Sequence, residues 1–175
     1  MSGKHLIIIG FMGTGKSSVG QVLAKRIGRT WIDTDLEVER KVNKSISELF
    51  EENGEACFRL WEKHVLIEAL AERPAVITTG GGIVLDQDNV KQITDSGWVV
   101  ALDASVDELI KRLKANTSRP LLSGDVRERV TQLKKKRQGA YDFADFHLDT
   151  SGLTPDEVSD RILRNWKEIT DELGV

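Results

Sequence analysis

The stretch GFMGTGKS at residues 10–17 decides how the rest of the chain is interpreted, and it directly follows the apolar run LIIIG at residues 6–10. It fits the pattern G-x-x-x-x-G-K-[ST] through Gly10, Gly15, Lys16 and Ser17. Glycines in such a turn let successive backbone N–H groups curl around phosphate oxygens, and a helix starting near Lys16 adds the positive end of its dipole. The stretch therefore predicts a nucleotide-phosphate site.

Within this motif the side chains have separate expected tasks. Lys16 is expected to reach the β and γ phosphates of ATP, and Ser17 Oγ is expected to ligate Mg²⁺. The residues expected to contact the nucleotide in the turn and the first helical turn are Gly13, Thr14, Gly15, Lys16, Ser17 and Ser18.

Length and composition exclude several classes of protein. The 175 residues suit one domain, and the formal charge of −3, from 25 basic and 28 acidic residues, gives no overall field that favours DNA or a membrane. Cys57 is the only cysteine, so no intrachain disulfide can form. No apolar stretch has the length of a membrane span, and no signal peptide is evident. We expect a cytoplasmic, soluble monomer without a nucleic-acid or membrane partner.

Short β-rich runs alternate with helical periods along the chain, which is typical of an α/β protein. Five runs separated by helices predict a parallel sheet covered on both faces. The expected strands are 5–10, 29–33, 75–79, 98–103 and 146–150.

Helix boundaries are signalled by caps. The first helix is expected over 16–27, with Gly28 as its C-terminal cap. Three capping-box patterns mark further helix starts: Ser45 with Glu48, Ser105 with Glu108, and Thr154 with Glu157. A helical stretch over 46–72, broken near Asn53 and Gly54, exceeds what a crossover requires and suggests a subdomain. Residues 115–125 lose the helical period and favour a loop that could act as a lid.

Two carboxylate positions compete for the magnesium site. Asp103 ends an apolar run, but it stands just before the Ser105 cap, which favours a structural role. Asp33 and Asp35, in WIDTD, would share one face if the strand continues, because side chains repeat every second residue. Adjacent carboxylates repel unless a cation or a donor lies between them, so we assign Asp33 to Mg²⁺ and its waters and Asp35 to a substrate hydroxyl. The alternative is that both are turn aspartates that cap a helix beginning near Leu36.

Arginines and glycines supply further candidates. Arg137 continues the apolar stripe of Val126, Val130 and Leu133, so it either extends outward to solvent or pairs with an anion inside, while Lys134–Lys136 look like a solvated face. Arg119 lies in SRPLL and could close on phosphates or be a plain surface residue. The three glycines of TTGGG, Gly80, Gly81 and Gly82, follow the third strand, where ligands approach the ends of parallel strands.

A guanine-nucleotide switch is not supported. The chain has no N/T-K-x-D element, and the D-x-x-G pattern at 149–152 follows the fifth strand, too late for a switch near the γ-phosphate. We interpret that pattern as coincidence.

Taken together, these motifs resemble the shikimate kinase family over essentially the whole chain. The residues that carry the resemblance are GFMGTGKS, the DTD at 33–35, CFRLWE around Arg59, GGG at 80–82, SRPLL at 118–122 and the Arg137–Tyr141 spacing. The resemblance implies a nucleoside-monophosphate-kinase-like fold with five parallel strands in the order 2-3-1-4-5. It also implies one domain over 1–175, with a substrate-binding subdomain near 34–62 and a lid near 115–125.

The resemblance implies roles for individual residues as well. Asp35 would bind hydroxyls of shikimate and serve as the candidate base for its 3-hydroxyl, and Arg59, Arg137 and the Gly80–Gly82 backbone would hold the rest of that substrate. Asp33 would orient Mg²⁺ waters. Arg119 would reach the ATP phosphates from the lid, and Arg112 would pack on adenine, although KRLK is by itself an ordinary helix surface.

Three functional hypotheses stay open at this point. The first is ATP-dependent phosphorylation of the 3-hydroxyl of shikimate, in the pathway to chorismate and the aromatic amino acids, with Mg²⁺ as cofactor. The second is a kinase for another small polyol acid such as gluconate. The third is a nucleotide-binding regulatory module that has no acceptor substrate.

Overall fold

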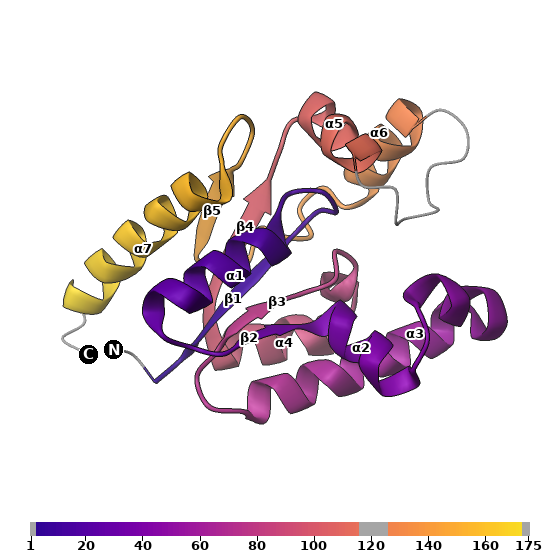
Figure 1. Ribbon diagram of the computed structural model, residues 1–175, viewed down its shortest axis with the longest axis horizontal. Helices are drawn as coiled ribbons and strands as arrows, with labels where there is room; N and C mark the ends of the chain where they lie inside the picture. Colours follow the sequence, from indigo (N-terminus) through magenta and orange to yellow (C-terminus); the bar gives the residue numbers. More distant parts are fainter. Residues whose placement is uncertain (1–2, 116–125, 173–175) are drawn as a thin grey trace.

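The structure, a computed structural model that describes residues 3–115 and 126–172, is built around one parallel sheet (Figure 1). Its five strands lie in the order β2-β3-β1-β4-β5, which confirms the expected order. The strands are β1 (His5–Gly10), β2 (Trp31–Asp33), β3 (Val76–Thr78), β4 (Gly97–Asp103) and β5 (Phe146–Asp149). The expected strand over 5–10 is confirmed, whereas the outer strands are shorter than expected.

Helices connect the strands and cover both faces of the sheet. They are α1 (Lys16–Ile27), α2 (Thr34–Val42), α3 (Ile46–Ala71), α4 (Gln87–Ser96), α5 (Val106–Ala115), α6 (Val126–Lys136) and α7 (Pro155–Glu172), with a short 3-10 turn at Ile83–Leu85. The predicted first helix over 16–27 is confirmed. None of the helices in the described ranges is long and apolar enough to cross a membrane.

Strand β1 shows that the sheet is the middle layer of a three-layer fold, with an apolar cluster on each face. Leu6 and Ile8 pack into the apolar cluster on the side of α1 and α7, whereas Ile7 and Ile9 pack into the cluster on the side of α3 and α4. All four side chains are fully buried, because β1 is the central strand and both faces are covered. The run LIII therefore needs no polar alternation.

The capping predictions are confirmed at two helices and half confirmed at a third. Ser45 with Glu48 and Thr154 with Glu157 each form both reciprocal hydrogen bonds. Ser105 accepts the Glu108 N–H at 3.2 Å, but its own N–H donates to Ser151 Oγ instead of to the Glu108 carboxylate. The box of Ser105 and Glu108 is incomplete because the Glu108 carboxylate has another partner, described below.

The break expected in the long helical stretch is also present. At Gly54 the backbone leaves the helical region, with φ of 77° and ψ of 173°, and α3 kinks there. A separate small apolar cluster, centred on Val38, Leu49, Phe58 and Val65, joins α2 to α3 on both sides of this kink.

A buried histidine ties the start of β1 to the neighbouring chain. The Ala75 N–H donates to His5 Nδ1 at 3.2 Å, so the ring hydrogen is on Nε2, which donates to the Leu70 carbonyl oxygen at 3.2 Å. Both nitrogens are used only in the neutral ring. Burial lowers the pKa of His5 below its usual value of 6.5.

The lowered pKa of His5 predicts a pH-dependent loss of stability. The unfolded chain binds a proton below pH 6.5 more readily than the folded chain does, so the contribution of His5 is present above that pH and is lost as the pH falls. We expect His5→Gln, which keeps a neutral donor and acceptor, to reduce the drop in unfolding free energy between pH 7.5 and 5.5 by up to about 1 kcal/mol in urea titrations. His147→Gln, at an exposed histidine, is the matched control, and an equal change in both variants would contradict the assignment.

Candidate active site

The turn between β1 and α1 has the backbone shape that its glycines permit. Gly10, Gly13 and Gly15 have φ of 138°, 80° and 92°, where other residues are strained. A methyl group on Gly10 would also clash with the Leu102 carbonyl oxygen of β4. Because α1 begins at Lys16, the N–H groups of its first turn lie beside this loop. The loop therefore combines glycine conformations with a helix N-terminus, as a phosphate-binding turn requires.

Lys16 lies folded against its own loop. Its Nζ donates to the carbonyl oxygens of Gly10 and Phe11, both at 2.9 Å, and only 9% of the residue is exposed. Thr14 Oγ1 donates to the same Phe11 oxygen at 2.8 Å. These contacts hold the ammonium charge at the turn, next to the N–H groups of α1.

Asp33 performs two tasks with its two oxygens. Oδ1 accepts the backbone N–H groups of Asp35 and Leu36, at 3.1 and 3.3 Å, and so caps α2. Oδ2 accepts the hydroxyls of Ser17 at 2.7 Å and Thr78 at 2.8 Å. The capping alternative is therefore correct for Asp33, and the same side chain also contacts the residue expected to bind the metal.

The expected placement of Asp33 and Asp35 on one face of a strand is wrong. Strand β2 ends at Asp33, and α2 begins at Thr34 rather than near Leu36, so Asp35 belongs to the first helical turn. The cause is local, because the Asp33 side chain bonds the Asp35 N–H and starts the helix at once. The Asp35 carboxylate lies against Gly80 instead, where a methyl group would be 2.5 Å from Oδ1.

Each glycine of the GGG motif makes room for one predicted side chain. A methyl on Gly80 would meet Asp35, one on Gly81 would lie 3.1 Å from Arg137 Nη1, and one on Gly82 would lie 2.6 Å from Arg59 Nη2. Gly81 also abuts the phosphate loop, since its methyl would be 3.3 Å from the Gly10 carbonyl oxygen. The structure thus brings Asp35, Arg59 and Arg137 together beside the glycine-rich turn.

Arg137 is half-buried, and its guanidinium lies against the phosphate loop rather than extended into solvent. Its guanidinium carbon is 5.5 Å from the centre of the Phe11 ring, and Tyr141, one helical turn later, donates its hydroxyl to the Gly81 carbonyl oxygen at 2.7 Å. Nη1 of Arg137 is buried without a hydrogen-bond partner among the described residues. A buried, unsatisfied guanidinium N–H is costly, which favours the anion-binding alternative for this arginine.

Arg59 is held by two acidic residues on its own helix. Nη1 donates to Glu62 at 2.6 Å and Nη2 to Glu55 at 3.0 Å. Glu62 is 1% exposed, whereas the Glu55 side chain is 64% exposed, so the inner ion pair is much less screened by solvent.

Sequence reasoning did not identify Glu62. Its Oε1 is buried without a hydrogen-bond partner in the described part of the chain and would lie 2.8 Å from a methyl on Gly80. Burial raises the pKa of the Glu62 carboxyl, while the hydrogen bond and charge of Arg59 act in the opposite direction. The available signal was that Glu62 interrupts the buried stripe of α3 formed by Phe58, Val65 and Leu66.

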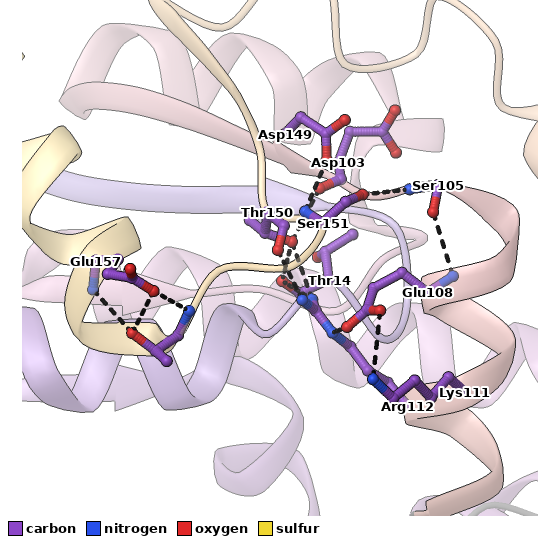
Figure 2. A network of polar contacts seen from close by, with 11 residues as sticks. Thr14, Asp103, Ser105, Glu108, Lys111, Arg112, Asp149, Thr150, Ser151 and Glu157 are labelled. Atoms are coloured by element: carbon purple, nitrogen blue, oxygen red, sulfur yellow. Dashed lines mark hydrogen bonds and ion pairs between the residues drawn. The ribbon is translucent and has the colours of Figure 1, made fainter.

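Arg112 is fixed over the phosphate loop and is not the ordinary helix surface that KRLK indicates (Figure 2). Its guanidinium donates to Thr150 Oγ1 at 2.9 Å, to the Thr150 carbonyl oxygen at 2.7 Å and to the Thr14 carbonyl oxygen at 3.3 Å. Nε donates to Glu108 at 2.7 Å, which explains why Glu108 does not complete the capping box with Ser105.

The D-x-x-G stretch at 149–152 is likewise part of this network. The Asp149 side chain accepts the Ser151 N–H at 2.7 Å, and Thr150 Oγ1 donates to the Thr14 carbonyl oxygen at 3.1 Å. The loop after β5 therefore supports the phosphate loop through contacts that its sequence pattern does not predict.

The remaining candidates have separate places. Asp103 has the structural role that was favoured, since it pairs with Lys134 at 2.9 Å, and Lys134 also donates to the Ala104 carbonyl oxygen, so this lysine is not merely solvated. Ser17 and Ser18 are exposed in the first turn of α1. Arg119 and the expected lid over 115–125, except Ala115 at the end of α5, lie outside the described residues.

Comparison with known proteins gives one consistent family. The family model described as shikimate kinase matches residues 12–167. The shikimate kinase of Thermodesulfovibrio yellowstonii is 40% identical over 169 residues, covering 96% of this chain and 98% of that protein. The shikimate kinase of Pelotomaculum thermopropionicum is 39% identical over 94% of this chain and 96% of its own length.

Solved structures agree with the sequence comparison. Shikimate kinase from Acinetobacter baumannii in complex with shikimate has a TM-score of 0.89 at 32% identity, covering 94% of this chain and 93% of that one. A gluconokinase from Sinorhizobium meliloti has a TM-score of 0.64 at 17% identity, over 98% and 95% of the two chains, which is a likeness of fold alone.

Two glycine substitutions should separate backbone contacts from side-chain contacts. Gly10→Ala should lower the unfolding free energy by about 3 kcal/mol, because the residue has positive φ and its methyl meets a backbone carbonyl in β4. Gly82→Ala should cost less, about 1 to 2 kcal/mol, because its φ is negative and its methyl meets the end of the Arg59 side chain rather than backbone, although a shift of Arg59 disturbs its ion pair with buried Glu62. Urea denaturation measures both, and equal losses would contradict this distinction.

Proposed function

This chain belongs to the shikimate kinase family, and we propose that Asp35, Arg59 and Arg137 hold the acceptor in its phosphoryl transfer from ATP. The reaction is transfer of the γ-phosphate to the 3-hydroxyl of shikimate, which forms shikimate 3-phosphate on the way to chorismate and the aromatic amino acids. The observation that carries the residue assignment is the convergence of these three side chains on Gly80–Gly82, directly beside the phosphate loop.

Arg59 and Arg137 are proposed to bind the carboxylate of shikimate. Guanidinium groups suit this task because their paired N–H donors match both oxygens of a carboxylate. Arg137 brings a buried Nη1 without a partner in the described residues, and Arg59 is oriented by Glu55 and Glu62. An incoming carboxylate would satisfy Arg137 at low entropic cost, since both guanidiniums are already held.

Asp35 is proposed to accept a hydrogen bond from the 3-hydroxyl and to take its proton as the phosphoryl group arrives. The carboxylate lies against Gly80, and the next residue, Gly81, abuts the phosphate loop. Because phosphoryl transfer depends mainly on positioning and charge neutralisation, we assign Asp35 chiefly to orienting the hydroxyl.

The phosphate loop is proposed to hold ATP through Gly13, Thr14, Gly15, Lys16, Ser17 and Ser18. Lys16 is already beside the loop, where its Nζ donates to two neutral carbonyl oxygens. It can exchange these contacts for phosphate oxygens, which are negatively charged and therefore stronger acceptors. Arg112 is proposed to pack against the adenine, since it is fixed next to Thr14 at the outer side of the loop. Arg119 is proposed to reach the phosphates from a lid near 115–125, and residues near 34–62 to form the substrate-binding subdomain of the single domain.

Ser17 and Asp33 are proposed as the protein's contribution to a Mg²⁺ site. Ser17 Oγ donates its hydrogen to Asp33, which leaves the oxygen lone pairs of Ser17 for a hard cation. The ion, when bound with ATP, supplies neutralisation of phosphate charge. We also propose a monomeric, cytoplasmic enzyme whose partners are its two small-molecule substrates.

The test of the acceptor is ADP release measured by a coupled assay with shikimate, with gluconate and without any acceptor. We expect ADP release well above background with shikimate alone. A rate raised by gluconate but not by shikimate would favour the alternative of a kinase for another small polyol acid. ATP binding without any acceptor-dependent turnover would favour a regulatory module.

Replacing Arg137 tests the carboxylate assignment. Arg137→Leu removes the charge and the donors, so we expect KM for shikimate to rise about 10- to 100-fold, the effect of a lost charge-assisted contact, with KM for ATP unchanged. Lys135→Leu, at an exposed position of α6 two residues before Arg137, is the control. A rise in both KM values would show that Arg137 supports the nucleotide site as well.

A further inference from the structure

The indole of Trp31 is linked to Ser17 by a chain of three hydrogen bonds. Trp31 Nε1 donates to Thr78 Oγ1 at 3.1 Å, and Thr78 Oγ1 donates to Asp33 Oδ2 at 2.8 Å. Ser17 Oγ donates to the same carboxylate oxygen at 2.7 Å. The chain connects the edge strand β2, through β3, to the first turn of α1.

The direction of each bond follows from the chemistry of the groups. An indole N–H can only donate, so Thr78 Oγ1 must accept from Trp31. The single hydroxyl hydrogen of Thr78 then goes to Asp33, because an ionised carboxylate can only accept. Ser17 must also donate to Asp33, and its oxygen lone pairs therefore point away from the carboxylate. The carboxylate thus sets the direction of both hydroxyls, and the indole N–H holds the Thr78 oxygen in position.

Asp33 has little freedom to change its role in this chain. Its other oxygen accepts two N–H groups of α2, so the carboxylate receives four donors in all. Thr78 is completely buried, and a buried hydroxyl needs its partners. Loss of the Trp31 donor would leave the buried Thr78 oxygen without that partner, would let the threonine side chain shift and would weaken the order around Oδ2.

The packing of α1 is adapted to this chain. A methyl group on Gly20 would clash with Thr78 Cγ2 and would lie 2.8 Å from Trp31 Nε1. The missing side chain at Gly20 therefore lets the helix that carries Ser17 lie directly over the indole and the threonine.

We propose that Trp31 is a positioning residue for the metal–nucleotide site. Its indole N–H holds Thr78 Oγ1 in place, and Thr78 in turn holds the Asp33 oxygen that accepts the Ser17 hydroxyl, so that the lone pairs of Ser17 would be available to the cation. The inference rests on the proposed assignment of Ser17 and Asp33 to Mg²⁺. The competing explanation is that Trp31 serves only as a packing residue at the edge of the cluster around α1, in which case its N–H has no influence on the nucleotide.

Trp31→Phe separates these explanations, because it keeps an aromatic ring and removes only the donor-bearing part of the indole. Calorimetry would give the Kd of ADP with excess Mg²⁺ and, separately, with EDTA. We expect binding of Mg²⁺·ADP to weaken about three- to tenfold, the effect of one lost buried hydrogen bond, and metal-free ADP to bind as it does to the unaltered chain. Thr78→Val should give the same pattern, and Thr78→Ser, which keeps the hydroxyl, should restore tight binding.

Trp98→Phe is the matched control. The Trp98 indole nitrogen is buried and has no hydrogen-bond partner in the part of the chain that the structure describes, so its loss should leave both affinities unchanged. The inference is wrong if Trp31→Phe binds Mg²⁺·ADP as tightly as the unaltered chain does. It is also wrong if the substitution weakens the binding of metal-free ADP as much as the binding of Mg²⁺·ADP.

Ser17→Ala distinguishes failure of this inference from failure of the proposed metal site. If Ser17→Ala weakens Mg²⁺·ADP and Trp31→Phe does not, only the role of Trp31 is overturned. If Ser17→Ala has no metal-dependent effect, the Mg²⁺ assignment itself fails and the inference falls with it.

A measurement on the unaltered protein covers the case in which Trp31→Phe does not fold. Indole ¹H–¹⁵N resonances would be followed while Mg²⁺ is added to the ADP complex. We expect the Trp31 resonance to shift with Mg²⁺ and the Trp98 resonance to stay in place. An unmoved Trp31 resonance at saturating Mg²⁺ would overturn the inference.

Discussion

The carboxylate of Asp33 is the interaction on which the arrangement of this protein depends. One oxygen starts α2, and the other joins the first turn of α1 to the end of β3. The helix pair that carries Asp35 and Arg59 is therefore anchored to the same group that orients Ser17. Removing the carboxylate would leave four donors without their acceptor, and buried donors without partners are costly. The nucleotide and acceptor sides of the site thus share one structural support.

The charges around the acceptor site are closely balanced before any substrate is present. Two arginines face Asp35 and Glu62, and Glu55 lies at the exposed side of Arg59. Burial raises the pKa of the Glu62 carboxyl, so this residue holds Arg59 at some cost to its own ionised form. A substrate carboxylate would compete with Glu62 for the guanidinium, and the partly satisfied Arg137 would favour the substrate. The geometry of Arg59 is then set by its helix rather than by the ligand.

Local signals in the sequence predicted the elements whose structure depends on neighbours along the chain. The phosphate turn, the first helix with its Gly28 cap and the kink at Gly54 are all decided by glycine conformations, and each was correctly placed. The convergence of Asp35, Arg59 and Arg137 was implied by the resemblance to shikimate kinases and not by local signals. The strand argument for Asp35 was wrong, because a cap by Asp33 started the helix earlier.

Contacts between distant segments could not be predicted in the same way. Thr78 and Thr150 act through partners that lie near them only after the sheet has formed, and neither stands in a recognisable pattern. Glu62 pairs with Arg59 on its own helix, but it approaches Gly80 only in the folded chain. Ser105 and Glu108 show that a distant contact can also override a local pattern. The Glu108 carboxylate accepts from Arg112 Nε, so the capping box keeps only one of its two hydrogen bonds. The resemblance to shikimate kinases supplied the order of the strands, which the alternation of strands and helices alone left open.

The pairing of β1 with β3 sets the relative position of the two glycine-rich turns that follow these strands. Ile8 lies opposite Thr78, and two residues farther along each strand the chain reaches Gly10 and Gly80. Neighbouring strands are about 4.8 Å apart, a spacing that backbone hydrogen bonds enforce and side chains cannot alter. The pairing of these strands thus sets how the phosphate loop lies relative to the glycine-rich turn. Insertions in loops that do not join β1 or β3 to the site leave this arrangement unchanged. A slip of one residue in the pairing of β1 with β3 would move the two glycine-rich turns relative to each other.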